Sequence, residues 1–267
     1  MAPKRVEAGR GRKSGVVKAR KQSSTTNRAF YLIIAAIAIV GVAALTYLSA
    51  RPKNVGTVSQ IDTTLPKVES HGYVLGSANA PLEVTEFGDF ECPACGTFSV
   101  LTEPEIRKRF VDAGQVRWRF IDDPLAMHGN TWQASRAAAC ADEQGKFWPY
   151  HDMLYQTQDQ WNTEATSNPD KFMKRYAQQL GLNTQQFDQC VDTKKYQAKI
   201  QAHAALAEQR KVMQTPTFLV GTQQVAGAQP YDVIAKTITE ELAKTGAKPG
   251  NVGGDTAKGA AVQKPGS

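Results

Sequence analysis

Cysteine is scarce in this chain of 267 residues, which contains four, and only one C-x-x-C pair occurs among them, at Cys92 and Cys95. A structural zinc site takes four ligands. Because a second C-x-x-C is missing and Cys140 and Cys190 are isolated, the sequence argues against zinc and predicts neither a metal nor a separate cofactor. Internal repeats are missing too, so the length fits one domain of ordinary size with appendages.

Acidic side chains are almost missing from the first 28 residues, which contain nine Lys or Arg and one acid, Glu7. The remaining residues contain 23 basic and 24 acidic side chains, so the net charge of +7 belongs to the N-terminal tail. That charge therefore predicts no nucleic acid partner for the folded part. The tail itself could touch RNA or anionic lipid, although a solvated segment that sets membrane topology is the simpler interpretation.

Charge is absent from residues 29–50, a run of 22 residues rich in Ile, Ala, Leu and Val. As a helix this run spans about 33 Å, enough to cross a hydrocarbon core of about 30 Å. The preceding excess of Lys and Arg predicts a cytoplasmic N-terminus, with everything after Arg51 outside the cytoplasm. A cleaved signal peptide is the alternative, but the apolar run is too long and Leu48-Ser49-Ala50 is a poor cleavage site. We therefore expect an uncleaved, single-pass anchor in contact with membrane lipid.

Periodic apolar patterns are lacking in two further segments. Residues 51–75 contain only scattered Val, Ile and Leu, which predicts a linker between the membrane and a folded domain. From residue 246 onward Gly, Lys, Pro and Ala dominate, which predicts a disordered tail over residues 246–267. The folded domain is therefore expected over residues 76–245.

The C-x-x-C pair lies where a strand is expected to pass into a helix. Residues 82–87 alternate apolar and polar side chains, as a half-buried strand does, and apolar residues recur at helical spacing after Cys95. Cys92 is then expected at the helix cap and Pro93 at the first helical position. The free N–H groups and the positive dipole end of a helix start stabilise a thiolate, the attacking species in disulfide exchange. Cys95, one turn later, can release a mixed disulfide, whereas a purely structural bridge would close too small a ring to add much stability.

The segments after this helix predict the rest of the domain. A second strand is expected at residues 116–121, a mainly helical block at about 125–212, and a strand pair at 217–220 and 223–226. An amphipathic helix at 231–242 closes the domain. This order is the one that a thioredoxin fold with an inserted helical subdomain requires.

Three motifs carry a resemblance to a known family. The segments E-F-G-D-F-E-C-P-A-C at residues 86–95, Q-G-K-F-W-P-Y-H-D at 144–152 and Q-T-P-T-F at 214–218 resemble, in the same order, the DsbA-like thiol–disulfide oxidoreductases. The resemblance covers about residues 72–243 and leaves out the membrane segment and both tails. It implies an α/β protein, a thioredoxin fold with an inserted helical subdomain, here preceded by one transmembrane helix.

The resemblance also implies roles for single residues. It makes Cys92 the nucleophile and Cys95 the buried resolving thiol. It makes Pro216 a cis-proline whose strand faces the sulfurs, so that the backbone of Thr215 meets an extended substrate chain. Glu86 matches a buried acid beneath the active site that accepts the proton of the resolving thiol, with an exposed strand carboxylate as the alternative.

Several residues depart from the family's pattern. Gln214 stands where relatives often have glycine, beside the cis-proline. The dipeptide Pro93-Ala94 lacks a histidine that could stabilise the thiolate. Asp89 and Glu91 should oppose the thiolate through their charge, although solvent can screen them while the helix contribution stays in place.

Three residues of the helical block are further candidates. Cys140 and Cys190 lie on apolar faces, and two buried free thiols are one interpretation, since free Cys packs as a small hydrophobe. Because the domain is expected outside the cytoplasm, where disulfides persist, we predict a structural bridge between them. His128, after the second strand, could approach the active site, although a structural or solvated histidine is the commoner case.

The expected function is that of a membrane-anchored, extracytoplasmic dithiol oxidase that uses no cofactor beyond its Cys92–Cys95 disulfide. Its expected partners are exported proteins with free thiols and a quinone-linked membrane reoxidant, DsbB-like or VKOR-like. A reductase or isomerase of the same compartment is one alternative, although residues 51–75 are too short for the dimerisation module that such isomerases usually carry. A non-catalytic assembly protein is the other, and it would tolerate the loss of Cys92.

Overall fold

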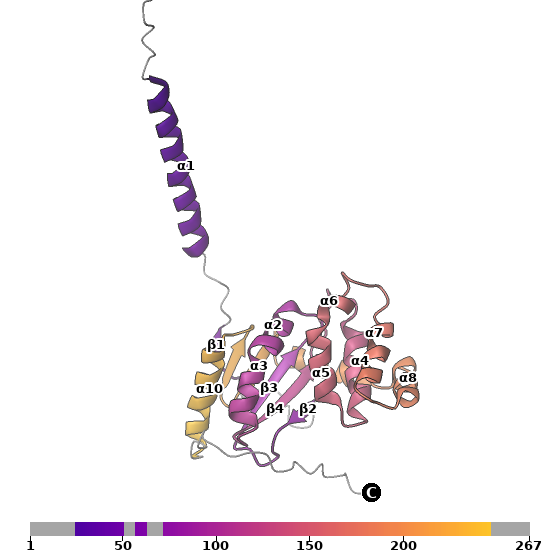
Figure 1. Ribbon diagram of the computed structural model, residues 1–267. Coiled ribbons are helices and arrows are strands. Elements are labelled where there is room, and N and C mark those ends of the chain that lie inside the picture. Colours follow the sequence, from indigo (N-terminus) through magenta and orange to yellow (C-terminus); the bar gives the residue numbers. More distant parts are fainter. Residues whose placement is uncertain (1–24, 51–56, 63–71, 247–267) are drawn as a thin grey trace, which may run out of the picture. The chain divides into compact units, whose positions relative to one another are not determined.

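The structure of the protein, a computed structural model, describes residues 25–50, 57–62 and 72–246 (Figure 1). The chain forms two compact units, Met1–Lys53 and Asn54–Ser267. The tails predicted at the two ends of the chain fall almost entirely on residues outside the described part, so they stay predictions.

The first unit contains helix α1 (Thr25–Ala50), which has 26 residues. Its segment Arg28–Thr46 has a mean hydropathy of 2.5, and none of this segment is buried within the protein. At a rise of about 1.5 Å per residue, the segment is long enough to cross most of a bilayer core. Length and composition thus make α1 a candidate membrane span, a test that a signal sequence near the N-terminus also passes.

The second unit is built on one mixed sheet in the part of the chain that the structure describes. Its strands run in the order β1-β6-β5-β3-β4-β2. The central strand β3 is parallel to β4 and antiparallel to β5. The strands are β1 (Val58–Gln60), β2 (Tyr73–Leu75), β3 (Leu82–Gly88), β4 (Val116–Asp122), β5 (Thr217–Val220) and β6 (Gln223–Ala226).

Helices connect these strands in three groups. After β3 come α2 (Pro93–Leu101), α3 (Glu103–Ile106) and the π-helical turn η1 (Arg107–Val111). Between β4 and β5 lie α4 (Thr131–Asp142), α5 (Phe147–Gln156), α6 (Gln158–Trp161), α7 (Asp170–Gln179), α8 (Thr184–Asp192) and α9 (Gln197–Gln209). The last helix is α10 (Tyr231–Lys244). The predicted thioredoxin fold with an inserted helical block is therefore confirmed.

Helices cover both faces of the sheet, and this changes the character of β3. Val84 packs in one apolar cluster with Trp118 and with residues of α2 and α10. Phe87, which points to the opposite face, packs in another cluster with Leu206 of α9. Six of the seven residues of β3 are buried as a result. The half-buried strand that the alternating pattern predicted is therefore wrong, because polar residues on this strand lie under helices.

The linker predicted for residues 51–75 is wrong in two places. Val58–Gln60 forms β1 and pairs antiparallel with β6, while Tyr73–Leu75 forms β2 and pairs antiparallel with β4. All three side chains of β1 are exposed, so backbone hydrogen bonds hold it and no apolar pattern marks it. In β2, by contrast, Tyr73 is buried and stacks on Phe147, with ring centroids 3.7 Å apart. The other residues of the predicted linker lie mostly outside the described part.

The inserted helical block has its own apolar core and a disulfide bond. The sulfur atoms of Cys140 on α4 and Cys190 on α8 are 2.06 Å apart, a disulfide bond across 50 residues of sequence. Both cysteines are nearly fully buried. Aromatic residues of the block, among them Tyr150 and Trp161, belong to the same buried apolar cluster as this disulfide. The block therefore packs, through this cluster, against the strand–helix junction that holds the C-x-x-C pair.

Candidate active site

The C-x-x-C pair lies at the start of α2, directly after β3. Cys92 is the residue that caps this helix, with extended backbone angles, and Pro93 is the first helical residue. Cys92 is 7% exposed and Cys95 is fully buried, and both are free thiols. Cys92 thus keeps a small exposed area, whereas Cys95 has none.

Hydrogen bonds give the two thiols opposite acidities. The pKa of Cys92 falls to about 6, chiefly because the Cys95 thiol donates a hydrogen bond to its sulfur, and backbone N–H groups of Ala94 and Cys95 add to this against the effect of burial. The pKa of Cys95 is raised well above its usual value, first by burial and then by Cys92. The N–H groups of the helix start therefore contribute as predicted, but the neighbouring thiol contributes more.

The loop before β5 closes the site on the other side of Cys92. The peptide bond between Thr215 and Pro216 is cis, and the carbonyl oxygen of Thr215 lies 3.5 Å from the sulfur of Cys92, within hydrogen-bond reach of its thiol. Pro216 is buried, and Gln214 is exposed. The structure thus brings Cys92 together with Thr215 and Pro216, which lie more than 120 positions later in the sequence.

Glu86 lies in β3 beneath the two cysteines and is fully buried. One carboxyl oxygen, Oε2, accepts a hydrogen bond of 3.0 Å from the indole N–H of Trp118. Burial raises the pKa of Glu86 well above its usual value, and the charge of Glu103 adds to the rise. The alternative of an exposed strand carboxylate is therefore wrong, because helices cover this face of the sheet.

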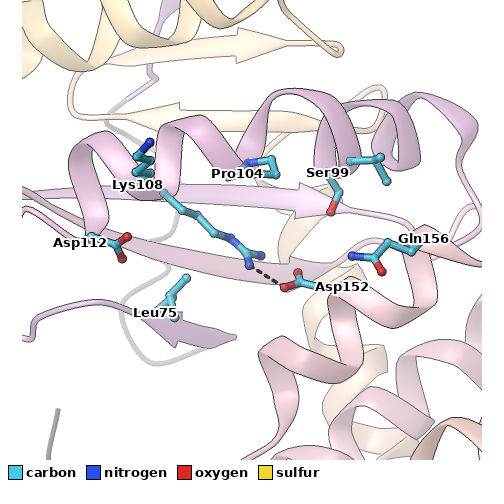
Figure 2. Close-up of a pocket in the computed structure, with 9 residues that line it drawn as sticks. Leu75, Ser99, Pro104, Lys108, Asp112, Asp152 and Gln156 are labelled. Atoms are coloured by element: carbon cyan, nitrogen blue, oxygen red, sulfur yellow. Dashed lines mark hydrogen bonds and ion pairs between the residues drawn. The ribbon is translucent and has the colours of Figure 1, made fainter. Parts of the chain in front are cut away.

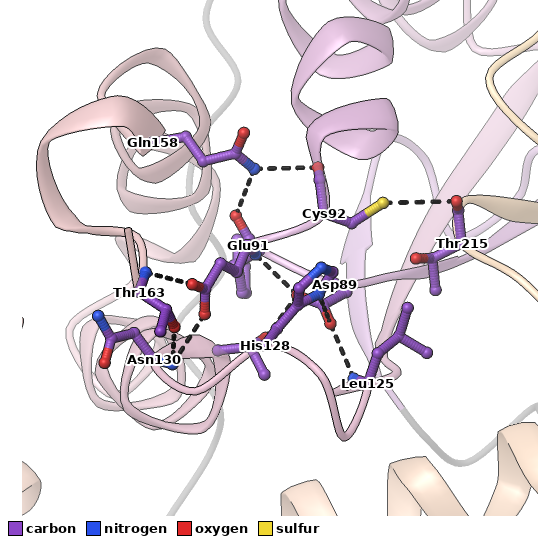
Figure 3. A network of polar contacts seen from close by, with 11 residues as sticks. Asp89, Glu91, Cys92, Leu125, His128, Asn130, Gln158, Thr163 and Thr215 are labelled. Atoms are coloured by element: carbon purple, nitrogen blue, oxygen red, sulfur yellow. Dashed lines mark hydrogen bonds and ion pairs between the residues drawn. The ribbon is translucent and has the colours of Figure 1, made fainter. Parts of the chain in front are cut away.

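Asp89 is a buried anchor for the turn that leads to Cys92 (Figure 3). Its Oδ1 accepts hydrogen bonds of 2.7 Å from the backbone N–H of Glu91 and from the hydroxyl of Thr131. Its Oδ2 accepts a bond of 2.8 Å from the backbone N–H of Leu125 and lies 2.7 Å from Nδ1 of His128. His128 therefore contacts Asp89, which holds the turn, and its role is structural.

Glu91 is held in the same way by the helical block. Its two carboxyl oxygens accept hydrogen bonds from the backbone N–H groups of Asn130 and Thr163. Asp89 is 1% exposed and Glu91 is 5% exposed, so solvent does not screen their charges, and that part of the prediction is wrong. Close N–H donors stabilise these carboxylates instead.

Gln158, at the start of α6, is a site residue that the sequence did not reveal. Its side-chain N–H₂ donates hydrogen bonds of 2.8 Å to the carbonyl of Phe90 and of 3.0 Å to the carbonyl of Cys92. Its Oε1 lies close to α2, since a Cβ at Gly96 would come within 2.9 Å of it. No local pattern marks such a residue, because its role depends on a contact across more than sixty positions.

Together these contacts describe a site for thiol chemistry. A buried, hydrogen-bonded turn holds one acidic thiol that keeps a small exposed area, beside a fully buried second thiol and a buried carboxyl group. Within the described residues, no group of three or more His, Cys, Asp or Glu side chains is placed to hold a metal ion. The arrangement can exchange disulfides through Cys92 and resolve the product through Cys95.

Comparison with known proteins agrees with this site. A family model described as thioredoxin matches residues 69–240. The probable disulfide bond formation protein D of Bacillus anthracis is 30% identical over 173 residues, which are 64% of this chain and 78% of that protein. Disulfide bond formation protein D of Bacillus subtilis is 29% identical over 175 residues, 63% of this chain and 76% of that protein.

A second kind of relative is much longer. The Na(+)/H(+) antiporter NhaA 3 of Salinispora tropica is 30% identical over 190 residues, which are 71% of this chain and 28% of that protein. The chain thus spans just over a quarter of this relative's length. Antiport is the activity in the name of that longer protein, of which the alignment covers 28%.

Solved structures share the fold. BdbD from Bacillus subtilis, in its oxidised form, matches with a TM-score of 0.59 and 24% identity, covering 69% of this chain and 100% of that chain. Alpha-DsbA1 of Wolbachia pipientis matches with a TM-score of 0.60 and 22% identity, covering 68% of this chain and 94% of that chain. With the family match and the two-thiol site, these findings place the chain in the thioredoxin family, as a member of the DsbA-like thiol–disulfide oxidoreductases.

Proposed function

We propose that this protein is a membrane-anchored dithiol oxidase that acts outside the cytoplasm and introduces disulfides into exported proteins. The observation that carries the proposal is the asymmetry of the two thiols. The pKa of Cys92 is lowered to about 6, whereas that of Cys95 is raised. A stabilised Cys92 thiolate favours the reduced form of the pair, and this makes the disulfide form an oxidant.

The reaction starts from the Cys92–Cys95 disulfide. A thiolate of the substrate attacks the sulfur of Cys92, the bond between the two cysteines breaks, and a mixed disulfide forms. Cys95 leaves as a thiolate and takes a proton from Glu86, whose pKa is raised by burial, so that its protonated form is favoured. A second thiolate of the substrate then attacks its own sulfur in the mixed disulfide, and Cys92 leaves as a stabilised thiolate. Two electrons pass from the substrate dithiol to the protein.

The surroundings of Cys92 support an extended protein chain as the substrate. The backbone carbonyl of Thr215 lies beside the sulfur, in the loop just before β5. A backbone group in this position can pair with the main chain of a substrate segment, whatever its side chains are. This is the recognition that an enzyme acting on many unrelated exported proteins needs.

The proposed compartment and partners follow from α1. The segment Arg28–Thr46 is apolar enough to cross a membrane, and residues 1–28 hold nine Lys or Arg. This charge favours a cytoplasmic N-terminus and an exported catalytic domain. Each turnover leaves two reduced thiols, so the cycle also requires an oxidant, for which we propose a quinone-linked membrane protein, DsbB-like or VKOR-like.

Redox equilibration of the full chain in detergent tests the direction of the reaction. The protein is incubated in glutathione buffers of graded potential, and the reduced fraction of Cys92 and Cys95 is read by alkylation and mass spectrometry. An oxidase requires a potential less negative than that of thioredoxin, about −270 mV. A potential at or below that value would instead favour a reductase. If cells that carry the Cys92→Ser variant assembled their exported proteins as the wild type does, a non-catalytic role would be favoured.

A further inference from the structure

Gln158 contacts the active-site turn from the helical block, and the reaction above gives it no role. Its side chain is half-buried at the start of α6. Its N–H₂ group donates to the carbonyl oxygens of Phe90, at 2.8 Å, and of Cys92, at 3.0 Å (Figure 3). Asp89 and Glu91 hold the same turn through their own carboxylates. Gln158 instead binds the backbone of the reactive cysteine itself.

The carbonyl group of Cys92 belongs to the first turn of α2. It also accepts a hydrogen bond of 3.0 Å from the backbone N–H of Gly96, as carbonyl groups at a helix start do. In the same turn, the backbone N–H groups of Ala94 and Cys95 donate to the sulfur of Cys92. The Gln158 amide therefore holds the turn that also contains the donors for the thiolate.

Gly96 makes room for this amide. It is buried inside α2 and its backbone is helical, so no unusual conformation calls for glycine there. A helix interior also favours alanine over glycine. A Cβ at this position, however, would lie 2.9 Å from Oε1 of Gln158 and 3.2 Å from both its Cδ and its Nε2. Because these distances are shorter than van der Waals contact, a side chain at position 96 and the Gln158 amide compete for one space.

The contact between α2 and α5 is less complete beyond this first turn. A pocket of about 580 Å³ lies there, lined among others by Ser99 and Val100 of α2 and by Asp152 and Gln156 of α5 (Figure 2). Arg107 lines it too and forms an ion pair of 3.0 Å with Asp152. Close packing therefore does not fix this side of α2 along its whole length, which leaves a role for a specific contact at its first turn.

We propose that Gln158 is a positioning residue that fixes the first turn of α2, and with it the sulfur of Cys92, against the helical block, and that Gly96 admits its amide. This role rests on the proposed oxidase function, which needs a stabilised Cys92 thiolate. Without the amide, the Cys92 carbonyl loses a hydrogen bond, and the donors around the sulfur are held less firmly. Two carbonyl oxygens, which are negative dipole ends, also lose the N–H₂ group that compensates them. Both effects raise the pKa of Cys92 toward its usual value.

Alkylation of the reduced full chain in detergent, followed over pH, measures this effect. Gln158→Ala should shift the midpoint for labelling of Cys92 upward by about 0.5–1 pH unit, the size that the net contribution of one hydrogen bond corresponds to. Gln158→Glu, which also adds a negative charge, should shift it further. Gly96→Ala should shift it in the same direction, because its methyl group displaces the amide. The double variant Gly96→Ala/Gln158→Ala should shift it no more than Gln158→Ala, since both changes remove one contact.

Gln160→Ala is the matched control, because this glutamine of the same helix is exposed and accepts a hydrogen bond from Arg175. Its midpoint should equal that of the wild type. An unchanged midpoint in Gln158→Ala, or additive shifts in the double variant, would overturn the proposal.

Labelling of Cys95 checks the fold of each variant, since this thiol is fully buried. If Gln158→Ala exposed Cys95 to the label, Gly96→Ala, which keeps Gln158 and favours the helix, would decide. The absence of a shift in Gly96→Ala would then overturn the proposal. Because the midpoint is read without turnover, this result is separate from the redox potential that tests the oxidase function.

Discussion

The two cysteine pairs of this protein have similar burial and very different surroundings. Cys92 and Cys95 are 7% and 0% exposed, and Cys140 and Cys190 are 1% and 4% exposed. The first pair begins a helix, beside N–H donors and the carbonyl of Thr215, whereas the second joins two helices within an apolar cluster. Burial alone therefore does not separate a reactive thiol from a structural one. Hydrogen-bond donors aimed at the sulfur do.

The comparison extends to the chemistry of the two bridges. Cys92 and Cys95 are three positions apart, so their disulfide constrains little of the unfolded chain and its formation is readily reversed. The Cys140–Cys190 bridge spans 50 residues and removes much more freedom from the unfolded chain. The first pair is thus suited to thiol–disulfide exchange, and the second to stabilising the folded domain.

Loss of the Cys92 thiol should have the largest effect on the function. Cys92→Ser should reduce oxidation of a dithiol peptide to the uncatalysed background, since no other thiol receives the same donors. Cys95→Ala should instead accumulate mixed disulfides with substrate through Cys92, visible on non-reducing gels. The double variant Cys140→Ala/Cys190→Ala is the control and should keep its activity. If that control lost as much activity as Cys92→Ser, the claim that only the Cys92–Cys95 pair is reactive would be wrong.

Loss of the second bridge should have the largest effect on stability. For a 50-residue loop, chain entropy predicts a contribution of about 4 kcal/mol to the free energy of unfolding. The Cys140→Ala/Cys190→Ala variant should unfold at correspondingly lower denaturant concentration. Reducing only Cys92 and Cys95 in the wild-type protein should cost no stability, because the stabilised Cys92 thiolate favours the reduced form. A variant as stable as the wild type would show that the bridge is dispensable.

Glu91→Gln tests the anchoring of the active-site turn, with a smaller expected effect. Glu91 accepts hydrogen bonds from two backbone N–H groups of the helical block, and an amide can accept only at one of its two ends. We expect a loss of about 1–3 kcal/mol in the free energy of unfolding. The exposed Glu105→Gln is the matched control. If Glu91→Gln made Cys92 more acidic without any loss of stability, Glu91 would act only through its charge.

Much of the site could be predicted because its signals are local. The C-x-x-C motif, Pro93 at the first helical position and the strand before them predict a helix-start thiol without any tertiary information. The cis-proline loop and Glu86 came from the family resemblance, and the structure has the loop in contact with Cys92 and Glu86 buried where it interacts electrostatically with Cys95.

The remaining features could not be predicted because they depend on contacts between distant segments. Gln158 and Thr163 touch the active-site turn from the helical block, and no periodicity marks them. The edge strand β1 is held through its backbone, so its side chains carry no pattern. The burial of Asp89 likewise follows from donors on other segments, and the sequence alone suggested a solvated carboxylate.

Alkylation of the reduced full chain in detergent, across about pH 4 to 9, tests the central claim most directly. The label is mapped by mass spectrometry at each pH, with the Cys140–Cys190 bridge left intact. The account predicts that Cys92 is labelled first, with a midpoint near its pKa of about 6, while Cys95 stays protected. Preferential labelling of Cys95, or a Cys92 that titrates near the ordinary value of about 8.5, would contradict it.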